Sequence, residues 1–220
     1  MGARGILHGL VAVTALVPSH HRELQTQVST SAGLTSALAN TAVGHIVLAS
    51  GTYILSAELS ITRSIVLEAV VAGSCVLHAQ ASSSNPRRVL NINPGSTGVV
   101  QLIGLNITGG YVTNNGGGVY IYSGTVTLSS CTITGNSVAH YGGGVLIAGI
   151  GKVTLSSCII TGNSAYSATN TGNNPTNNGG GGVAVFTTGG TVAILSSNIS
   201  GNIVAGQNSV RAHAQTFPWP

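Results

Sequence analysis

Three copies of one short pattern fill the second half of the chain, and this repeat constrains the fold more than any single residue. The copies are GGGVYIYSGTVTLSSCTITGN (copy 1, residues 116–136), GGGVLIAGIGKVTLSSCIITGN (copy 2, residues 142–163) and GGGVAVFTTGGTVAILSSNISGN (copy 3, residues 180–202). A unit this short cannot bury its apolar face alone, so it must stack on its neighbours. The repeat therefore predicts a solenoid whose successive copies form successive coils.

The copies share an alternation of apolar and polar residues with a period of two, which is typical of short strands with one buried face. The same frame extends one step upstream through residues 100–110. Strands stacked about 4.8 Å apart place equivalent side chains on top of one another. We therefore expect four apolar ladders inside the coils, namely Val119/Val145/Val183, Ile121/Ile147/Val185, Leu128/Leu155/Ile194 and Ile107/Ile133/Ile160/Ile199.

Each coil is expected to contain three short strands joined by tight corners. In copy 1 the strands are residues 117–121, 125–128 and 131–134, with corners at Ser123-Gly124, Ser129-Ser130 and Gly135-Asn136. Glycine and asparagine tolerate the left-handed backbone that such corners require. Asn136, Asn163 and Asn202 close the copies, and we expect them to stack and pass amide hydrogen bonds from coil to coil.

Upstream of the copies, the sequence predicts one short helix and six further strands. Residues 34–42 (LTSALANTA) form the expected helix, which would cover the open end of the solenoid and its unpaired strand edges. The strands are expected at residues 45–49, 51–55, 59–61, 65–67, 75–77 and 89–92, where Gly, Ser, Asn or Pro separate them.

The composition indicates one folded, weakly charged domain. Charged residues are 5% of the 220 residues, and the net charge of +4 comes from scattered cations, of which only Arg87 and Arg88 are adjacent. A nucleic-acid site needs a dense basic stripe, so we expect no nucleic-acid partner. We place the β-helix domain at residues 34–208 and an irregular tail at residues 209–220.

Residues 1–33 are expected to be a signal-like or capping segment with a linker. One positive charge precedes an uncharged, mostly apolar run at residues 5–17. Its length suits the core of a secretory signal and is too short to span a bilayer. The alternative is an apolar segment that caps one end of the solenoid. Apolar runs elsewhere have the length of strands, so we expect no transmembrane helix.

The cysteines, Cys75, Cys131 and Cys158, form no CxxC or Cys/His cluster with zinc spacing. In the repeat alignment, Cys131 and Cys158 occupy one interior ladder between Leu105 and Ser197. Stacked neighbouring strands seldom offer disulfide geometry. We therefore interpret these two cysteines as buried free thiols that act as small apolar side chains.

The copies and the segment before them resemble a known group of proteins. Residues 46–69 (IVLASGTYILSAELSITRSIVLEA) look like the first coils of right-handed parallel β-helix proteins of the pectin-lyase-like superfamily. The GGGV…TLSSCTITGN copies look like the repeats of polymorphic outer-membrane and adhesin-like β-helix proteins. The resemblance covers residues 34–208. It implies an all-β, single-stranded right-handed parallel β-helix with about three short strands per coil and a short N-terminal capping helix.

The resemblance implies little about function, because this scaffold carries lyases, hydrolases and adhesins alike. Its enzymes use acidic clusters, whereas this chain has no Asp and three acidic residues in all. Hydrolases need two carboxylates, and calcium-dependent lyases need several. We therefore assign no catalytic residue, metal or cofactor, although the question of an enzyme stays open. The fallback site for a polysaccharide lyase or hydrolase consists of Glu58, Glu68, Arg63, Arg87 and Arg88; the simpler interpretation is that they are isolated surface charges.

The sequence favours a non-catalytic surface or adhesion-type protein that is secreted or held at the cell surface. A rigid solenoid offers long faces rich in hydroxyl and amide groups, and tyrosine rings pack well against sugars. The candidate ligand face comprises outward residues of copy 1: Tyr120, Tyr122, Thr125, Thr127, Thr132 and Thr134. We expect a polysaccharide or cell-surface glycan as partner, and a monomer or a part of a longer solenoid as the assembly.

Two sequons, Asn106-Ile-Thr108 and Asn198-Ile-Ser200, make Asn106 and Asn198 candidate N-glycosylation sites in a eukaryotic secretory route.

Ice binding is a second alternative function, because it needs a regular, flat array of threonines. The four threonines of the candidate ligand face suit such an array. The equivalent positions in later coils include Lys152, Ile159 and Ala193, so the array is broken.

Overall fold

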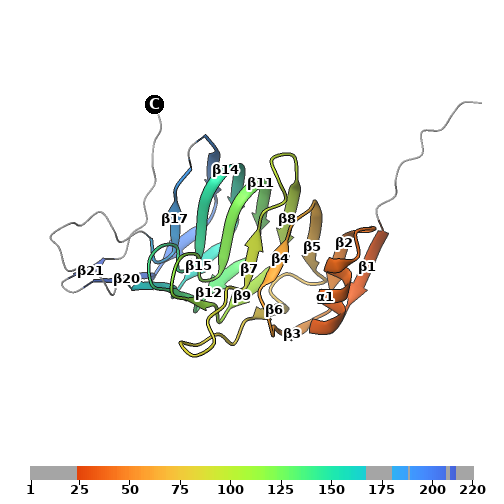
Figure 1. Ribbon diagram of the computed structural model, residues 1–220, viewed down its shortest axis with the longest axis horizontal. Coiled ribbons are helices and arrows are strands. Elements are labelled where there is room, and N and C mark those ends of the chain that lie inside the picture. Colours follow the sequence, from red (N-terminus) through yellow and green to blue (C-terminus); the bar gives the residue numbers. More distant parts are fainter. Residues whose placement is uncertain (1–23, 167–179, 188, 207–208, 212–220) are drawn as a thin grey trace, which may run out of the picture.

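The computed structural model describes residues 24–166, 180–187, 189–206 and 209–211 (Figure 1). The predicted signal-like run at residues 5–17 and most of the predicted tail lie outside these residues. The described elements are β1 (Leu24–Val28), α1 (Ser31–Ala39), β2 (Val43–Leu48), β3 (Gly51–Ile54), β4 (Leu59–Ile61), β5 (Ile65–Ala69), β6 (Cys75–His78), β7 (Leu90–Ile92), β8 (Val99–Ile103), β9 (Leu105–Thr108), β10 (Tyr111–Val112), β11 (Val119–Ser129), β12 (Thr132–Thr134), β13 (Ser137–Val138), β14 (Val145–Ser156), β15 (Ile159–Thr161), β16 (Ser164–Tyr166), β17 (Val183–Val185), β18 (Thr191–Leu195), β19 (Asn198–Ser200), β20 (Ile203–Gly206) and β21 (Ser209–Arg211).

The strands form three sheets, which we call sheets 1, 2 and 3. Within the described residues, sheet 1 has ten strands and includes β11 and β14, sheet 2 has six and includes β12 and β15, and sheet 3 has five and includes β13 and β16. In copies 1 and 2, consecutive strands thus lie in different sheets, and each pairs in parallel with the equivalent strand of the next copy. In copy 3, β17 and β18 both lie in sheet 1 and pair with β14. The chain is therefore mostly β, and its parallel sheets are consistent with the predicted β-solenoid.

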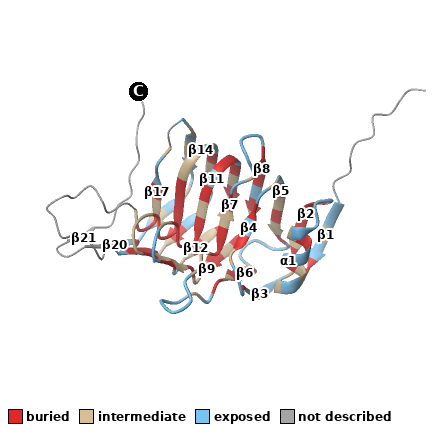
Figure 2. Cartoon of the chain, viewed as in Figure 1, coloured by how far each residue is buried: buried red, intermediate tan, exposed pale blue. Residues whose placement is uncertain are grey.

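The register of the sheets confirms all four predicted ladders. For example, Ile107, Ile133, Ile160 and Ile199 are successive Cα partners across sheet 2. The other three ladders follow from the pairing of β11 with β14 and of β14 with β17 and β18. Most of these side chains are fully buried, as Figure 2 shows for the middle strands of sheet 1. Burial falls in the last coil, where Ile194 is 38% exposed.

The helix α1 lies at the N-terminal end of the stack (Figure 1). It begins three residues before the predicted start because the Thr30 side chain accepts a hydrogen bond from the Gly33 amide and caps the first turn. Leu34 and Ala37 face the core. The six predicted upstream strands are all present, with bounds that differ by at most two residues from the prediction.

The predicted corner at Ser123-Gly124 is present as a bend within β11, although β11 and β14 are continuous strands. Gly124 has a left-handed φ of 89°, and Ser123 and Gly124 are both buried, so the alternation of inward and outward residues shifts there. At the equivalent place, β7 is separated from β8 and β17 from β18. Copy 2 has one residue more than copy 1, and the extra residue is absorbed as a bulge where the register of β11 and β14 shifts, opposite Tyr122. Gly149 lies at this bulge, where any Cβ would collide with the Tyr122 carbonyl. Sheet 3, which was not predicted, follows the asparagine of each copy.

The predicted asparagine ladder is confirmed, and its members are buried. The Asn136 side-chain amide donates to Oδ1 of Asn163 at 3.0 Å, and the Asn163 amide donates to Oδ1 of Asn202 at the same distance. The backbone amides of Asn136 and Asn163 donate to the same two oxygens. Each rung therefore ties the backbone and side chain of one coil to the next coil.

The glycine triplet that opens each copy leaves space for this ladder. A Cβ on Gly118 would lie 2.9 Å from Nδ2 of Asn136, and a Cβ on Gly144 would lie 3.0 Å from Nδ2 of Asn163. The third glycine and the closing asparagine are thus one packing unit, although they stand far apart in each copy.

The cysteines are free and buried, as the sequence predicts for Cys131 and Cys158. A hydrogen bond to the Cys158 thiol, together with burial, raises the pKa of Cys131 well above its usual range. The Cys131 thiol is therefore protonated at neutral pH and acts as a small apolar side chain.

Replacing Asn163 by alanine should lower the free energy of unfolding by about 3 kcal/mol or more, because it leaves buried partners such as the Ile133 carbonyl and the Asn136 amides without their hydrogen bonds. Asn198→Ala is the matched control, since Asn198 is exposed on β19 and should cost about 0.5 kcal/mol at most. Urea unfolding of both variants measures the difference. Equal losses would show that the ladder does not hold the coils together.

Candidate functional site

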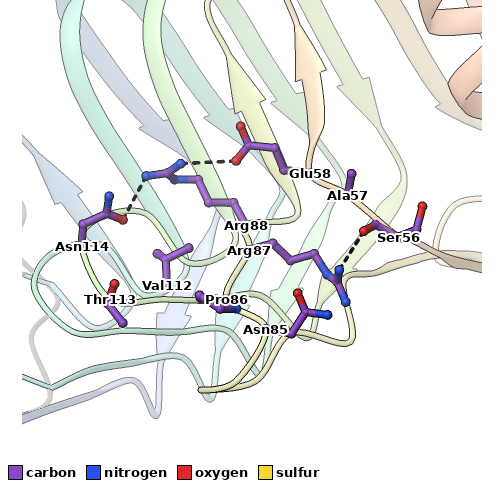
Figure 3. A pocket seen from close by; sticks show the side chains of 10 residues that line it. All are labelled: Ser56, Ala57, Glu58, Asn85, Pro86, Arg87, Arg88, Val112, Thr113 and Asn114. Atoms are coloured by element: carbon purple, nitrogen blue, oxygen red, sulfur yellow. Dashed lines mark hydrogen bonds and ion pairs between the residues drawn. The ribbon is translucent and has the colours of Figure 1, made fainter.

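An open pocket of about 460 Å³ lies where β4 and β7 meet the corner loop after β10 (Figure 3). Arg88 crosses it. Its Nη1 donates to Glu58 at 3.3 Å, its Nη2 donates to Asn114 Oδ1 at 3.2 Å, and its Nε donates to the Asn115 carbonyl at 2.9 Å. Glu58 also accepts a hydrogen bond from the Asn91 side chain at 2.9 Å. All three guanidinium nitrogens of Arg88 therefore hold the loop against the sheet.

Arg87, the other cation of this pocket, has a similar role. Its Nε donates to the Ala79 carbonyl and its Nη1 to the Ser56 carbonyl, each at 2.7 Å. Both arginines thus bind parts of their own chain, which leaves the pocket with little free charge for a ligand.

Beside the pocket, an aromatic strip lies along the outward face of sheet 1 and includes a residue of the corner loop before β14. We define the strip as Tyr120, Tyr122, Tyr141 and Phe186. The Arg88 guanidinium lies 5.0 Å from the centre of the Tyr120 ring, and the Tyr120 and Tyr122 rings are stacked with centres 6.4 Å apart. Tyr141 and Phe186 make an edge-to-face pair at 4.8 Å. Tyr122 and Phe186 are half exposed, so part of each ring is open to a ligand.

The register of sheet 1 places Tyr122 and Phe186 in one column. The Phe186 amide donates to the Ile147 carbonyl, which sets Phe186 opposite Ala148, and Tyr122 lies opposite Ala148 on the other side, at the bulge. Two strand spacings of about 4.8 Å separate the two aromatic positions. Sequence reasoning missed Phe186, although it occupies the position of Tyr122 in copy 3; a column-by-column comparison of the copies would have found it.

The structure divides the predicted ligand face between two sheets. Four of its residues project from β11 in sheet 1: Tyr120, Tyr122, Thr125 and Thr127. Thr132 and Thr134 project from β12 in sheet 2. A single flat ligand therefore cannot contact all six residues together.

The sheet 2 residues belong to two outward columns that cross the coils. One column contains the predicted sequon residues Asn106 and Asn198, with Thr132 and Ile159 between them. Asn106 donates to the Gly73 carbonyl at 2.8 Å, whereas Asn198 is exposed. The other column is a run of four hydroxyl side chains, Thr108, Thr134, Thr161 and Ser200.

The charges of the fallback site are spread over the molecule. Glu68 bonds to His45 at 2.9 Å, and Arg63 donates to carbonyls at the C-terminal end of α1, including that of Leu38 at 3.2 Å. The positive charge of Arg63 suits the negative end of the helix. Of the five charges, only Glu58 and Arg88 form an ion pair with each other in the described structure.

Glu58 and Glu68 lie at opposite ends of the long strands of sheet 1. Leu59, which follows Glu58, pairs with Leu90 of β7, and Leu90 pairs with Val119 at the start of β11. Glu68 pairs with Ile103 of β8, and Ile103 pairs with Ser129 at the end of β11. The chain turns between β4 and β5, and Gly124 bends β11 at the matching place with a φ of 89°. Glu58 lines the pocket and Glu68 does not, so the two glutamates do not form a pair of carboxylates within that pocket.

Two further features of the described residues bear on function. No three His, Cys, Asp or Glu side chains among them gather as potential metal ligands. No helix among them is long and apolar enough to cross a bilayer.

A comparison of the chain with protein-family models, with curated proteins and with solved structures finds no match. The functional argument therefore depends on the geometry of the sheets.

Replacing Arg88 by methionine should lower the free energy of unfolding by about 2 kcal/mol, because it leaves the part-buried Glu58 carboxylate without its cation and frees the Asn115 carbonyl. Lys152→Met is the control, because Lys152 is exposed on β14 and should change stability by about 0.5 kcal/mol at most. Thermal unfolding compares the two. A neutral Arg88 variant would contradict the structural role given to this side chain.

Proposed function

We propose that the chain is a non-catalytic, extracytoplasmic surface or adhesion-type module that binds a glycan on the aromatic strip of sheet 1. The observation that carries this proposal is the pair of half-exposed rings, Tyr122 and Phe186, in one column of a rigid sheet. Aromatic faces bind the apolar faces of sugars, and a preformed surface loses little entropy when it binds.

The polar groups around the strip support a glycan rather than an apolar ligand. Asn91 is the Cα partner of Tyr120, and the exposed Asn93 follows in the column of Tyr122. Amide and hydroxyl groups beside an aromatic ring suit a ligand that carries hydroxyl groups around an apolar ring face.

The positions of the carboxylates favour binding over catalysis. Among the described residues that line the pocket, Glu58 is the single carboxylate, whereas a glycosidase needs two carboxylates at one glycosidic bond. Glu58 and Glu68 also each already accept a hydrogen bond from a neighbouring side chain. Detectable cleavage of a polyuronate, abolished by Glu58→Gln or Glu68→Gln, would reverse this assignment.

We further propose that the coils are right-handed, with about three short strands each, and that the chain belongs to the pectin-lyase-like superfamily. Parallel crossovers are almost always right-handed, and the sequence resemblance agrees. A signal function for residues 5–17 would place the chain outside the cell. The exposed Asn198 would then be the better N-glycosylation site of the two, since Asn106 is bonded to the backbone; enzymatic removal of N-glycans from the secreted protein tests this.

Ice binding is the second candidate, favoured by the hydroxyl column of sheet 2. Thr108, Thr134, Thr161 and Ser200 lie in register at strand spacing. The neighbouring column is interrupted by Ile159. Thermal hysteresis of the purified protein, lost in Thr134→Val/Thr161→Val, would favour ice over a glycan; freezing without hysteresis would remove this candidate.

A glycan array should identify a ligand, and Tyr122→Ala should then weaken binding about tenfold through loss of one stacking surface. Thr127→Ala is the matched control, because Thr127 projects from the same strand outside the strip and should leave affinity unchanged. Calorimetric titration with the best array ligand measures both. Binding that is unaffected by Tyr122→Ala, or the absence of any glycan ligand, would contradict the proposed function.

A further inference from the structure

We infer that the ligand of the aromatic strip is a linear, extended glycan of the cellulose or chitin type, and that it lies along the solenoid axis across the strands of sheet 1. This inference rests on the proposed glycan-binding function and specifies the shape and linkage of the ligand. It depends on the order of side chains in one column of the sheet.

That column crosses the coils in the order Thr62, Asn93, Tyr122, Ala148 and Phe186. The order follows from the register of sheet 1, in which Ile61, Ile92, Ile121 and Ile147 are successive Cα partners, so that the residues after them also lie in one column. Phe186 joins this column because its amide donates to the Ile147 carbonyl, which places it opposite Ala148. All but Ala148 are exposed. The column is therefore an open track of five positions, with two polar side chains at one end and two aromatic rings, separated by a small residue, at the other.

The spacing of this track suits an extended glycan. Successive positions are about 4.8 Å apart, which is close to the advance of one sugar along a fully extended, equatorially linked chain. In such a chain, alternate sugars present the same face to the same side. Tyr122 and Phe186 occupy alternate positions, so both rings can stack on one chain, on sugars separated by a single intervening residue.

The position between the two rings, at Ala148, has space for the sugar that lies between the two stacked sugars. Ala148 and Gly149 form the bulge opposite Tyr122. Ala148 carries only a methyl group and Gly149 carries no side chain, which leaves space for the exocyclic group of the sugar that faces the other way. Glycans with axial linkages curl, so their alternate sugars would not meet both rings.

The rings themselves are held in place. The rings of Tyr141 and Phe186 form an edge-to-face pair with centres 4.8 Å apart, and the rings of Tyr120 and Tyr122 are stacked with centres 6.4 Å apart. Tyr120 in turn lies under Arg88, which is bound to the corner loop. The Asn115 residue of that loop is bridged to Tyr141 of the next coil. One set of contacts therefore positions both aromatic platforms.

The experiment is a titration of the intact protein with oligosaccharides of increasing length. Two-sugar, three-sugar and four-sugar members of the cellulose and chitin series are compared with a three-sugar starch fragment and with oligogalacturonate. We expect an increase in affinity of about five- to tenfold from two sugars to three, because the third sugar is the first to reach the second ring.

Phe186→Ala should abolish the gain from two sugars to three while leaving two-sugar binding at Tyr122 within about twofold. Tyr122→Ala should also abolish the gain, and Thr127→Ala should preserve it. Circular dichroism of each variant shows whether the sheets are intact. If circular dichroism shows that Phe186→Ala disturbs the sheets, Phe186→Leu, which keeps the apolar bulk without the flat ring, is used in its place.

The outcomes separate this inference from the proposed function. A gain at three sugars that requires both rings supports the inference. Binding of the starch fragment or oligogalacturonate as tight as that of the cellulose or chitin series, or affinity that does not depend on length, overturns the inference and leaves glycan binding intact. If no oligosaccharide binds and the glycan array is also empty, both proposals are wrong.

Discussion

The buried asparagine ladder is the interaction on which the remaining structure depends. An apolar interior forbids a slip of one residue, which would turn the apolar side chains outward, but a slip of two residues keeps the same face buried. The ladder of amides excludes that second slip, because it would bury Asn163 without partners at a cost of several kcal/mol. The glycines at 118, 144 and 182 leave the space that the asparagines fill, so register is specified twice in every copy.

Fixed register turns a repeated sequence into a surface with a regular spacing. Once Ile121 lies over Ile147 and Ile147 over Val185, the next outward positions must also align, and they carry Tyr122, Ala148 and Phe186. A binding track along the axis is therefore a consequence of interior packing. The rings gain rigidity from the strands that carry them, and a long ligand can exploit a platform whose geometry is set before it binds.

How much of the fold could be predicted from the sequence depends on whether a feature repeats in the three copies. The ladders and the asparagine corner could be predicted because each copy supplies an independent reading of the same position. The corner at Ser123-Gly124 could be predicted because Gly124 can adopt the left-handed backbone that the bend requires. The continuity of β11 through that corner and the bulge formed by the extra residue of copy 2 could not, since both depend on pairing with neighbouring coils. Sheet 3 was missed because its strands β10 and β13 have two residues each, too few to show a period.

The candidate site was harder to predict because it is assembled from residues that the repeat does not constrain. Arg88 meets Tyr120 and Glu58 only through the stacking of coils, and nothing in its sequence neighbourhood indicates this. Interior positions must be nearly the same in every copy, or the ladder breaks. Outward positions carry no such requirement, so differences between copies, such as Tyr122, Ala148 and Phe186, accumulate there without loss of stability. In a solenoid, the positions that are the same in every copy therefore stabilise the fold. The outward positions that differ between copies are the ones that can recognise a specific ligand.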